Sequence, residues 1–280
     1  MKKCISYWSV EGGGDGSCPV STALSAAKEA GFDGLELCVG AGGVLTPETD
    51  QATCRRYAAQ AADLGLAIET VACGLSWAWS PTHPDPEVRR RSIELQAAAL
   101  QRTAWLGAQA MLFVPGAVLI PWDPSYAPVP YDRAVAWARE AVVELGRTAA
   151  EVGVDLGVEN VWNGLFYSPL ELAAFIDEID NPRVGVYFDL GNVLNHQQWP
   201  PHWIEILGPR LKRVHVKDFK LAVGNLDGFC DLLDGDVPFA ETMAALRAIG
   251  YDGTLVAEMM PPDPTLLART SRALDQILAL

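Results

Sequence analysis

Short apolar runs alternate with longer segments of helical periodicity along the whole chain. The runs are rich in Val, Ile and Leu, as expected of parallel strands covered on both faces. Eight strands are predicted, at 5–9, 35–39, 68–73, 111–114, 156–159, 184–189, 214–217 and 255–258. Eight helices are predicted to follow them in strict alternation, at 21–30, 49–64, 87–106, 131–152, 169–179, 202–207, 239–249 and 264–280.

Glycines support this alternation, because several predicted helices end in a glycine just before the next strand. The C-terminal cap of a helix needs a left-handed residue, which glycine supplies. Eight βα units within 280 residues match a TIM barrel, whereas a doubly wound sheet more often uses five or six strands. No charge shift or Pro/Ser-rich tract marks a boundary. We therefore predict an α/β protein with one domain, a (β/α)8 TIM barrel over residues 1–280.

Charge narrows the possible partners. The chain has 21 Lys and Arg against 35 Asp and Glu, a formal net charge of −14. Such a protein repels phosphate backbones and anionic lipid surfaces, so neither nucleic acid nor a membrane is predicted as a partner. Residues 103–122 carry no charge, but Pro115 and Pro121 would break a membrane helix there. Six cysteines without a C-x-x-C pair favour reduced thiols and a cytoplasmic location.

Polar residues close four otherwise apolar strands. Glu159, Asp189 and Glu258 end the fifth, sixth and eighth predicted strands, and His215 lies in the seventh. Active residues of a TIM barrel lie at the C-terminal ends of its strands. Neighbouring strands are about 4.8 Å apart, so we expect these four side chains to converge on one small patch.

Three carboxylates so close together repel one another unless a cation compensates them. One nitrogen and three oxygen ligands suit Mn²⁺, Mg²⁺ or Co²⁺ better than a thiolate-type zinc site does. Any one of these residues alone is as readily explained by a buried ion pair or a helix cap. The four together predict one divalent metal ion, with Mn²⁺ favoured and Mg²⁺, Co²⁺ or Zn²⁺ as alternatives.

Five ordered motifs carry a family resemblance: GFDGLEL at 31–37, VENVWN at 158–163, YFDLGN at 187–192, VHVKD at 214–218 and AE at 257–258. The chain resembles the xylose-isomerase-like sugar isomerase and epimerase superfamily over its whole length. Three segments, VENVWN, SPLE at 168–171 and FDLGN, are most similar to pentulose-5-phosphate 3-epimerases of the L-ribulose/L-xylulose 5-phosphate type. Their similarity to free-ketose 3-epimerases is more distant. The first motif is weak alone, whereas the ordered set is specific.

The resemblance implies that Glu159, Asp189, His215 and Glu258 bind the metal, and that Glu159 and Glu258 also act as the two acid/base groups. This agrees with the chemistry. To invert a carbon next to a ketone, a base removes the proton from one face and an acid returns it to the other. A metal that bridges the carbonyl and neighbouring hydroxyl oxygens stabilises the enediolate between these steps.

Two further residues are candidates for substrate binding. Glu36, which closes the second strand, is implied by the resemblance to contact substrate hydroxyls; a salt bridge at the barrel mouth is the alternative. Asn192 stands where free-ketose epimerases of this superfamily often have a histidine, which weakens the free-ketose interpretation. Its amide is still able to hydrogen-bond a substrate hydroxyl.

Lys217 is the third substrate-binding candidate. It lies two residues after His215 and therefore on the same side of the strand. With Arg213 and Lys220 it is expected to form the densest positive cluster near the later loops, which often hold phosphate in such barrels. A substrate or phosphate anchor and charge balance for Asp218 or Glu258 are equally supported, so the presence of a phosphate stays open.

A loop after the third strand carries Trp77 and Trp79. Aromatic rings at this position are able to form a sugar-facing wall or lid, but ordinary packing is the favoured interpretation.

These observations predict a metal-dependent sugar or sugar-phosphate epimerase or isomerase, with 3-epimerisation of a ketose or ketose 5-phosphate as the favoured reaction. An inosose-type dehydratase and a hydroxypyruvate-type isomerase are alternatives on the same metal site. An abasic-site endonuclease needs many histidines, and this chain has four. A non-catalytic barrel would not need all four predicted ligands. Family members are commonly dimers or tetramers, so the resemblance also implies a homo-oligomer.

Overall fold

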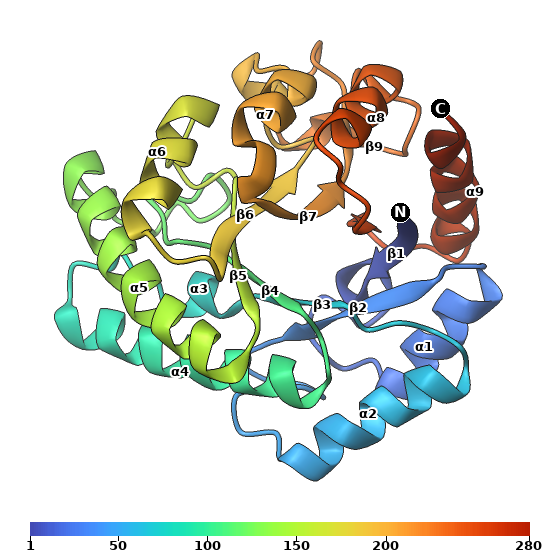
Figure 1. Cartoon of the computed structure of the whole chain (residues 1–280), viewed down its shortest axis with the longest axis horizontal. Coiled ribbons are helices and arrows are strands. Elements are labelled where there is room, and N and C mark those ends of the chain that lie inside the picture. Colours follow the sequence, from blue (N-terminus) through green and yellow to red (C-terminus); the bar gives the residue numbers. More distant parts are fainter.

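Eight parallel strands close into a barrel in the computed structural model, which describes all residues 1–280 (Figure 1). Each strand pairs with its sequence neighbours around the ring, and the last barrel strand, β10, pairs with β1 to close it. The prediction of a single (β/α)8 TIM barrel is confirmed. The barrel strands are β1 (Lys2–Ser6), β2 (Gly34–Val39), β3 (Thr70–Cys73), β4 (Ala110–Phe113), β5 (Asp155–Glu159), β6 (Val184–Asp189), β7 (Leu211–Val216) and β10 (Thr254–Ala257).

Eight helices cover the outside of the barrel (Figure 1). Several begin at the capping residues that their sequences offer; Asp50 and Asp85, for example, accept hydrogen bonds from the first-turn N–H groups of Thr53 and Glu87. The helices are α1 (Val20–Glu29), α2 (Gln51–Asp63), α4 (Pro86–Trp105), α5 (Tyr131–Val152), α6 (Pro169–Ile179), α7 (Pro200–Leu207), α8 (Phe239–Ala248) and α9 (Leu266–Ala279).

The first strand differs from its prediction at 5–9. It begins at Lys2 and ends at Ser6, and residues Tyr7–Ser9 form a 3-10 turn (η1). The apolar pattern missed Lys2 and Lys3, whose ammonium groups pair with acidic residues outside the strand while their backbones pair with β10. The turn directs the chain across the barrel mouth directly after the strand.

A glycine makes room for a tyrosine inside the barrel. A Cβ atom at Gly157 of β5 would lie 2.9 Å from the Cβ of Tyr187 on β6. Tyr187 is fully buried, and its ring lies 4.5 Å from that of His215, centroid to centroid. Gly157 therefore allows a large polar side chain to support the residues at the C-terminal ends of the strands.

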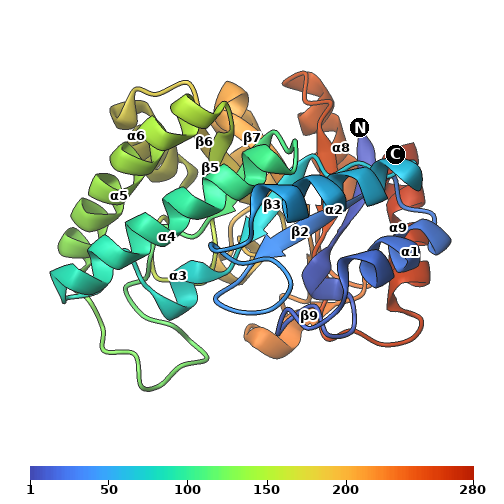
Figure 2. The same ribbon diagram turned by 90° about the horizontal axis from the view of Figure 1, so that it is seen from below.

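The loops at the C-terminal ends of the strands carry additional elements. These are α3 (Leu75–Ala78) after β3 and a hairpin of β8 (Asp218–Phe219) with β9 (Phe229–Cys230) after β7. Figure 2 shows α3, β9 and the long loop between β4 and α5 on the same side of the barrel. That loop is fixed to its neighbours, because Thr82 Oγ1 both donates to and accepts from the backbone of Ala117 at 2.8 Å.

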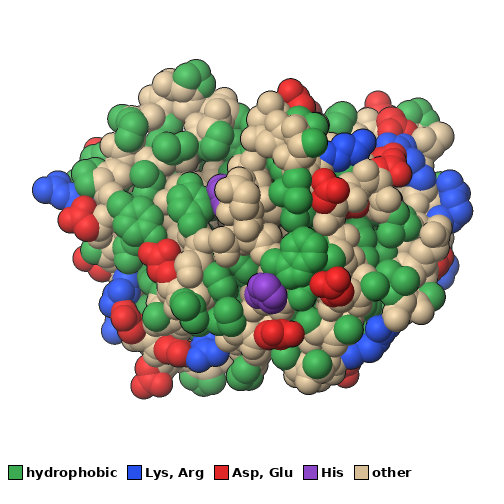
Figure 3. Space-filling view, turned by 90° about the horizontal axis from the view of Figure 1, so that it is seen from above, with side chains coloured by type: hydrophobic (Ala, Val, Ile, Leu, Met, Phe, Trp, Pro, Cys, Tyr) green, Lys and Arg blue, Asp and Glu red, His purple; other side chains and the backbone are tan.

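The surface in Figure 3 shows Lys and Arg side chains scattered among acidic and apolar ones, mostly near the edges of this face. This face therefore offers no basic patch of the kind that nucleic-acid binding needs. None of the helices combines the length and apolar character that a membrane span requires.

Candidate active site and metal centre

Four polar side chains meet at the C-terminal end of the barrel. Glu159 ends β5, Asp189 ends β6, His215 lies in β7 and Glu258 directly follows β10. One ligand atom from each lies within 4.8 Å of every other. All four residues are buried, at 7% exposure or less. The structure therefore brings together the four residues that the sequence placed at neighbouring strand ends.

Glu36 and Tyr187, which lie deeper in the barrel, orient the imidazole ring of His215. Its Nε2 lies 2.8 Å from Glu36 Oε2, and the hydroxyl of Tyr187 donates to Glu36 Oε1 at 2.5 Å. With Nε2 donating to Glu36, Nδ1 faces the cluster with its lone pair available. A carboxylate behind a histidine is the usual support of a metal-binding imidazole.

Two buried atoms of the cluster, His215 Nδ1 and Asp189 Oδ2, make no hydrogen bond of good geometry, although the Lys217 ammonium forms an ion pair with Asp189 Oδ2. The distances from Nδ1 are 2.9 Å to Glu258 Oε2, 3.5 Å to Glu159 Oε1 and 4.0 Å to Asp189 Oδ2. Leaving a buried polar atom unsatisfied costs about 1–3 kcal/mol, so such atoms need an explanation. A divalent cation bound among the four donors would satisfy both atoms, and three oxygens with one nitrogen suit Mn²⁺, Mg²⁺ or Co²⁺. The residues present therefore fit the predicted metal.

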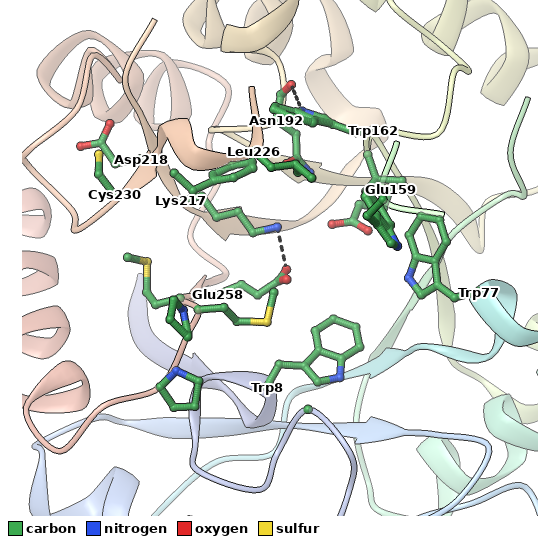
Figure 4. Close-up of a pocket in the computed structure, with 18 of the residues that line it drawn as sticks. Trp8, Trp77, Glu159, Trp162, Asn192, Lys217, Asp218, Leu226, Cys230 and Glu258 are labelled. Atoms are coloured by element: carbon green, nitrogen blue, oxygen red, sulfur yellow. Dashed lines mark hydrogen bonds and ion pairs between the residues drawn. The ribbon is translucent and has the colours of Figure 1, made fainter. Parts of the chain in front are cut away.

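Lys217 compensates part of the negative charge. Its Nζ lies 3.0 Å from Glu258 Oε2 and 3.1 Å from Asp189 Oδ2, and its side chain is 13% exposed (Figure 4). Lys217 was interpreted either as a substrate anchor or as charge balance, and the structure shows charge balance for Glu258. Its contact with a substrate stays a prediction.

The prediction that Lys217, Arg213 and Lys220 form a positive cluster is wrong. Arg213 points to the opposite end of the barrel, where it donates to Gln109 Oε1 at 2.9 Å, and Lys220 is exposed. Successive inward positions of one strand lie at different depths, which the alternation pattern alone does not reveal. Asp218 does not need Lys217 either, because its two oxygens accept hydrogen bonds from four backbone N–H groups.

The two glutamates have opposite pKa shifts. Burial raises the pKa of Glu159 to about 7, more than His215 and Lys217 lower it. Burial also acts to raise the pKa of Glu258, but the nearby charges of Lys217 and His215 outweigh it and lower the pKa to about 2. Two carboxyl groups whose pKa values are pushed apart suit one proton donor and one proton acceptor.

Two asparagines join the ends of β5 and β6. Asn160 Oδ1 accepts from the backbone N–H of Asp189 at 2.8 Å, and Asn160 Nδ2 donates to the Asp189 carbonyl at 2.9 Å. The Asn192 side chain donates to the Asn160 carbonyl at 3.0 Å, and its backbone N–H donates to Asp189 Oδ1 at 2.9 Å. This network fixes the positions of Glu159 and Asp189. Asn192 also lines the cavity, so its substrate contact stays a prediction.

Glu36 forms a buried ion pair with His215, in line with the salt-bridge alternative given for it. Glu36 is fully buried, it does not line the cavity, and its two oxygens are engaged by His215 and Tyr187. Its side chain points into the barrel below the cluster, not out of the mouth. It therefore holds a metal-ligand candidate in place, and its contact with a substrate stays a prediction.

A cavity of about 770 Å³ opens above the cluster (Figure 4). Glu159, Glu258, Lys217 and Asn192 line it together with aromatic side chains. Packing was the favoured interpretation for Trp77, but its ring forms part of the wall, whereas Trp79 does not line the cavity. Sequence reasoning missed the other aromatic residues, of which only Trp162 lies within a recognised motif. The missed wall residues are Trp8, Trp122, Trp162 and Phe229.

Comparison with known proteins agrees with this fold. Residues 24–277 match the family model described as xylose isomerase-like TIM barrel. The chain is 28% identical over 235 residues to a D-psicose 3-epimerase of Enterocloster bolteae, which covers 81% of this chain and 72% of the relative. It is 26% identical over 185 residues to an uncharacterized protein of Methanocaldococcus jannaschii, which covers 64% of this chain and 60% of the relative.

A solved structure extends the comparison over nearly the whole chain. The D-psicose 3-epimerase of Clostridium cellulolyticum, solved with D-tagatose, superposes with a TM-score of 0.80 over 99% of both chains, at 21% identity. The resemblance of the motifs to the xylose-isomerase-like superfamily, and to ketose 3-epimerases within it, is thus confirmed.

Proposed function

Because the chain belongs to the xylose isomerase-like TIM barrel family, we propose that it is a divalent-metal-dependent epimerase that inverts the carbon next to a sugar ketone. The favoured reaction is 3-epimerisation, since relatives in sequence and in fold are named D-psicose 3-epimerase. The observation that carries the proposal is the pair Glu159 and Glu258. Both line the cavity, both belong to the four-donor cluster, and their pKa values are shifted in opposite directions.

Glu258 is the proton acceptor for one epimer. Its carboxylate is kept ionised by Lys217 at 3.0 Å and is therefore ready to remove the proton from the carbon next to the carbonyl. Glu159, whose pKa is raised by burial, is the more readily protonated of the two carboxyl groups and donates a proton to the other face of that carbon. In the reverse direction the two glutamates exchange roles.

Glu159, Asp189, His215 and Glu258 would hold the metal, with Mn²⁺ favoured over Mg²⁺, Co²⁺ and Zn²⁺. When bound, the ion supplies positive charge that stabilises the negative charge developing on the sugar oxygens. Glu36 keeps the imidazole of His215 oriented toward the cluster. The asparagine network between β5 and β6 keeps Glu159 and Asp189 in position, and proton transfer to a carbon requires such fixed placement of Glu159.

The test is metal-dependent exchange of carbon-bound hydrogen with solvent. Ketopentoses, ketohexoses and their phosphates are incubated in D₂O with Mn²⁺, and NMR follows deuterium at the carbon next to the carbonyl. We expect exchange and epimer formation that EDTA abolishes and Mn²⁺ restores. Glu258→Gln is expected to lower the rate at least about 100-fold, the usual contribution of a general base.

Glu69→Gln is the matched control, because Glu69 lies at the opposite end of the barrel and pairs with Lys2. Its rate is expected to equal that of the unchanged protein. Metal binding without exchange of any sugar would contradict the proposal. Loss of water with a new enone absorbance would identify a dehydratase in its place, and migration of the carbonyl would identify an isomerase.

A further inference from the structure

Arg213 is a buried cation that forms no ion pair with an Asp or Glu of the chain. It lies in β7, two residues before His215, but its side chain points to the N-terminal end of the barrel, where it bonds Gln109. Arg213 is only 9% exposed. Buried charges in proteins are normally paired, because an unpaired charge that has lost its water destabilises the fold. Arg213 therefore lacks the counter-ion that a buried guanidinium normally has.

Most hydrogen-bond donors of this guanidinium are unused. An arginine side chain has five N–H donors in a rigid fork. One donates to the carbonyl oxygen of Lys212 at 2.7 Å and one to Gln109 Oε1 at 2.9 Å. Both acceptors are neutral, and the buried Nε has no partner. Because buried donors are normally satisfied, the unused N–H groups and the missing counter-ion both indicate an acceptor from outside the chain.

A cleft of about 310 Å³ lies beside Arg213. Its lining comes from residues 208–213 and 249–253, which include the segments that precede β7 and β10. The cleft is therefore at the N-terminal end of the barrel, and it shares no residue with the cavity above the four-donor cluster. Only three of its ten lining residues are hydrophobic, so it suits a polar ligand.

The same cleft has further hydrogen-bond donors. Lys212 lines it, and its ammonium lies 3.6 Å from Asp155 Oδ2. Asp252 and Gly253 also line it, and their backbone N–H groups make no hydrogen bond within the protein. The lining carries two cationic side chains against the single carboxylate of Asp252, in a chain whose net charge is −14. The cleft is thus a locally positive site, which favours an anion.

We propose that this cleft binds a phosphate group, as inorganic phosphate or as the phosphate of a small monoester, with Arg213 as its buried counter-ion. A guanidinium bonds two phosphate oxygens through parallel N–H groups, and an ammonium and free backbone N–H groups add further bonds. A tetrahedral dianion accepts from more of these donors than a planar carboxylate does. The site lies at the opposite end of the barrel from Glu159 and Glu258, so it is independent of the proposed epimerase reaction.

The first experiment is a calorimetric titration of the full chain in a chloride buffer with EDTA. The probes are inorganic phosphate, ribose 5-phosphate and acetate. We expect one phosphate to bind per chain with a Kd of about 1 mM or below, and acetate to bind about tenfold or more weakly. Tighter binding of ribose 5-phosphate than of inorganic phosphate would identify a monoester as the ligand, and equal or weaker binding would identify inorganic phosphate. No saturable binding of either phosphate, or equal binding of acetate, would overturn the inference.

Two variants locate the bound phosphate. Arg213→Gln is expected to raise the Kd for inorganic phosphate about tenfold or more, because it removes a charge-assisted contact. Lys217→Met is the matched control, since Lys217 is the only Lys or Arg that lines the cavity at the barrel mouth. Its Kd is expected to equal that of the unchanged protein. Loss of binding in Lys217→Met with retention in Arg213→Gln would place the phosphate at the mouth and overturn the inference.

A third variant tests the cleft without removing a buried side chain, in case Arg213→Gln does not fold. Asp252→Asn removes the only carboxylate that lines the cleft and leaves the guanidinium in place. Because Asp252 is exposed, the loss of its repulsion is expected to tighten phosphate binding by about two- to fivefold. The Tm should also rise with phosphate concentration in the unchanged protein and in Asp252→Asn. An unchanged or weaker affinity in Asp252→Asn would overturn the assignment of phosphate to this cleft.

Discussion

The hydrogen bond between His215 and Glu36 decides which imidazole nitrogen faces the cluster. Glu36 accepts from Nε2 of the imidazole and from the hydroxyl of Tyr187, and all three residues are fully buried. Removing the charge of Glu36 would leave the ring free to rotate or to change its tautomer. We therefore expect Glu36 to affect metal affinity and not sugar binding.

We expect Glu36→Gln to weaken Mn²⁺ binding by about 10- to 100-fold, the usual effect of removing the carboxylate behind a metal-binding histidine. Competition with a fluorescent chelator measures this affinity. Tyr187→Phe is the graded control, because it removes one hydrogen bond and retains the charge of Glu36, so its loss is expected to be smaller. Unchanged affinity in Glu36→Gln would show that His215 is not oriented in this way.

The pKa of Glu159 predicts how metal affinity depends on pH. Burial raises this pKa to about 7, so below pH 7 the metal must displace a proton from the carboxyl group. Apparent Mn²⁺ affinity is therefore expected to increase by about tenfold per pH unit or more below pH 7, with a smaller slope above it. Chelator competition between pH 5.5 and 8 measures the profile. In Glu159→Gln the slope of log affinity against pH is expected to fall by one, because one fewer proton is displaced. An affinity independent of pH would refute the assignment of Glu159 as a metal ligand.

At the scale of single residues, the strand pattern predicted which side chains gather at the barrel mouth. Glu159, Asp189, His215 and Glu258 were found because each interrupts an apolar strand at the same end. For Glu36 the sequence left substrate contact and a salt bridge open, because position along a strand does not tell whether a carboxylate points out of the mouth or supports a neighbour. The tryptophan wall was also missed, since apolar residues in loops look the same whether they pack or line a cavity.

The hairpin after β7 depends on one carboxylate. Asp218 accepts hydrogen bonds at 2.8–3.1 Å from the backbone N–H groups of Phe219, Leu233, Gly235 and Val237, and it is 1% exposed. These bonds join β8 to the segment that leads into α8. They also hold Phe229 of β9 against Trp162 in the cavity wall.

We expect Asp218→Asn to destabilise this segment by about 1–3 kcal/mol, because an amide offers one acceptor oxygen where the carboxylate offers two. Hydrogen exchange measured by mass spectrometry should show faster exchange in peptides that cover 229–237. Asp227→Asn is the matched control, since Asp227 lies in the exposed 3-10 turn η4 (Leu226–Gly228) of the same loop. Equal protection in Asp218→Asn and the unchanged protein would argue against this role.

Element prediction succeeded where the pattern was long and failed where local contacts decided. The helices are found within a few residues of their predicted bounds, because their apolar faces recur over several turns. The first strand was displaced, since paired lysines interrupt its apolar pattern. The helix α3 and the β8–β9 hairpin are too short to give a periodic signal.

For the whole molecule, a bound metal is expected to act as a stabiliser. Binding to the folded state alone adds about 2.7 kcal/mol at a concentration 100 times the Kd, which for a chain of this size corresponds to a rise in Tm of about 5–10 °C. Thermal unfolding with Mn²⁺ and with EDTA tests this. In Asp189→Asn, most of the Mn²⁺-dependent rise in Tm is expected to disappear. In Asp177→Asn, which changes a surface ion pair with Arg210, the rise in Tm should be retained. An identical Tm with and without Mn²⁺ would contradict a metal centre in the folded barrel.

The order of strands around the ring follows from the βα alternation, so the sequence predicts that the last four barrel strands bring their polar ends together. It does not predict the size or the walls of the cavity, which depend on segments that follow seven different barrel strands. The homo-oligomer implied by the resemblance stays a prediction, and light scattering on the Mn²⁺-loaded protein tests it.

The most direct test of the central claim is the fate of the hydrogen at the inverted carbon. A substrate that epimerises is incubated in D₂O with the Mn²⁺-loaded protein, and product and remaining substrate are analysed by NMR at low conversion. Two glutamates on opposite faces predict that the product carries deuterium at that carbon while the remaining substrate retains hydrogen. Product that forms with its original hydrogen would contradict the two-glutamate mechanism.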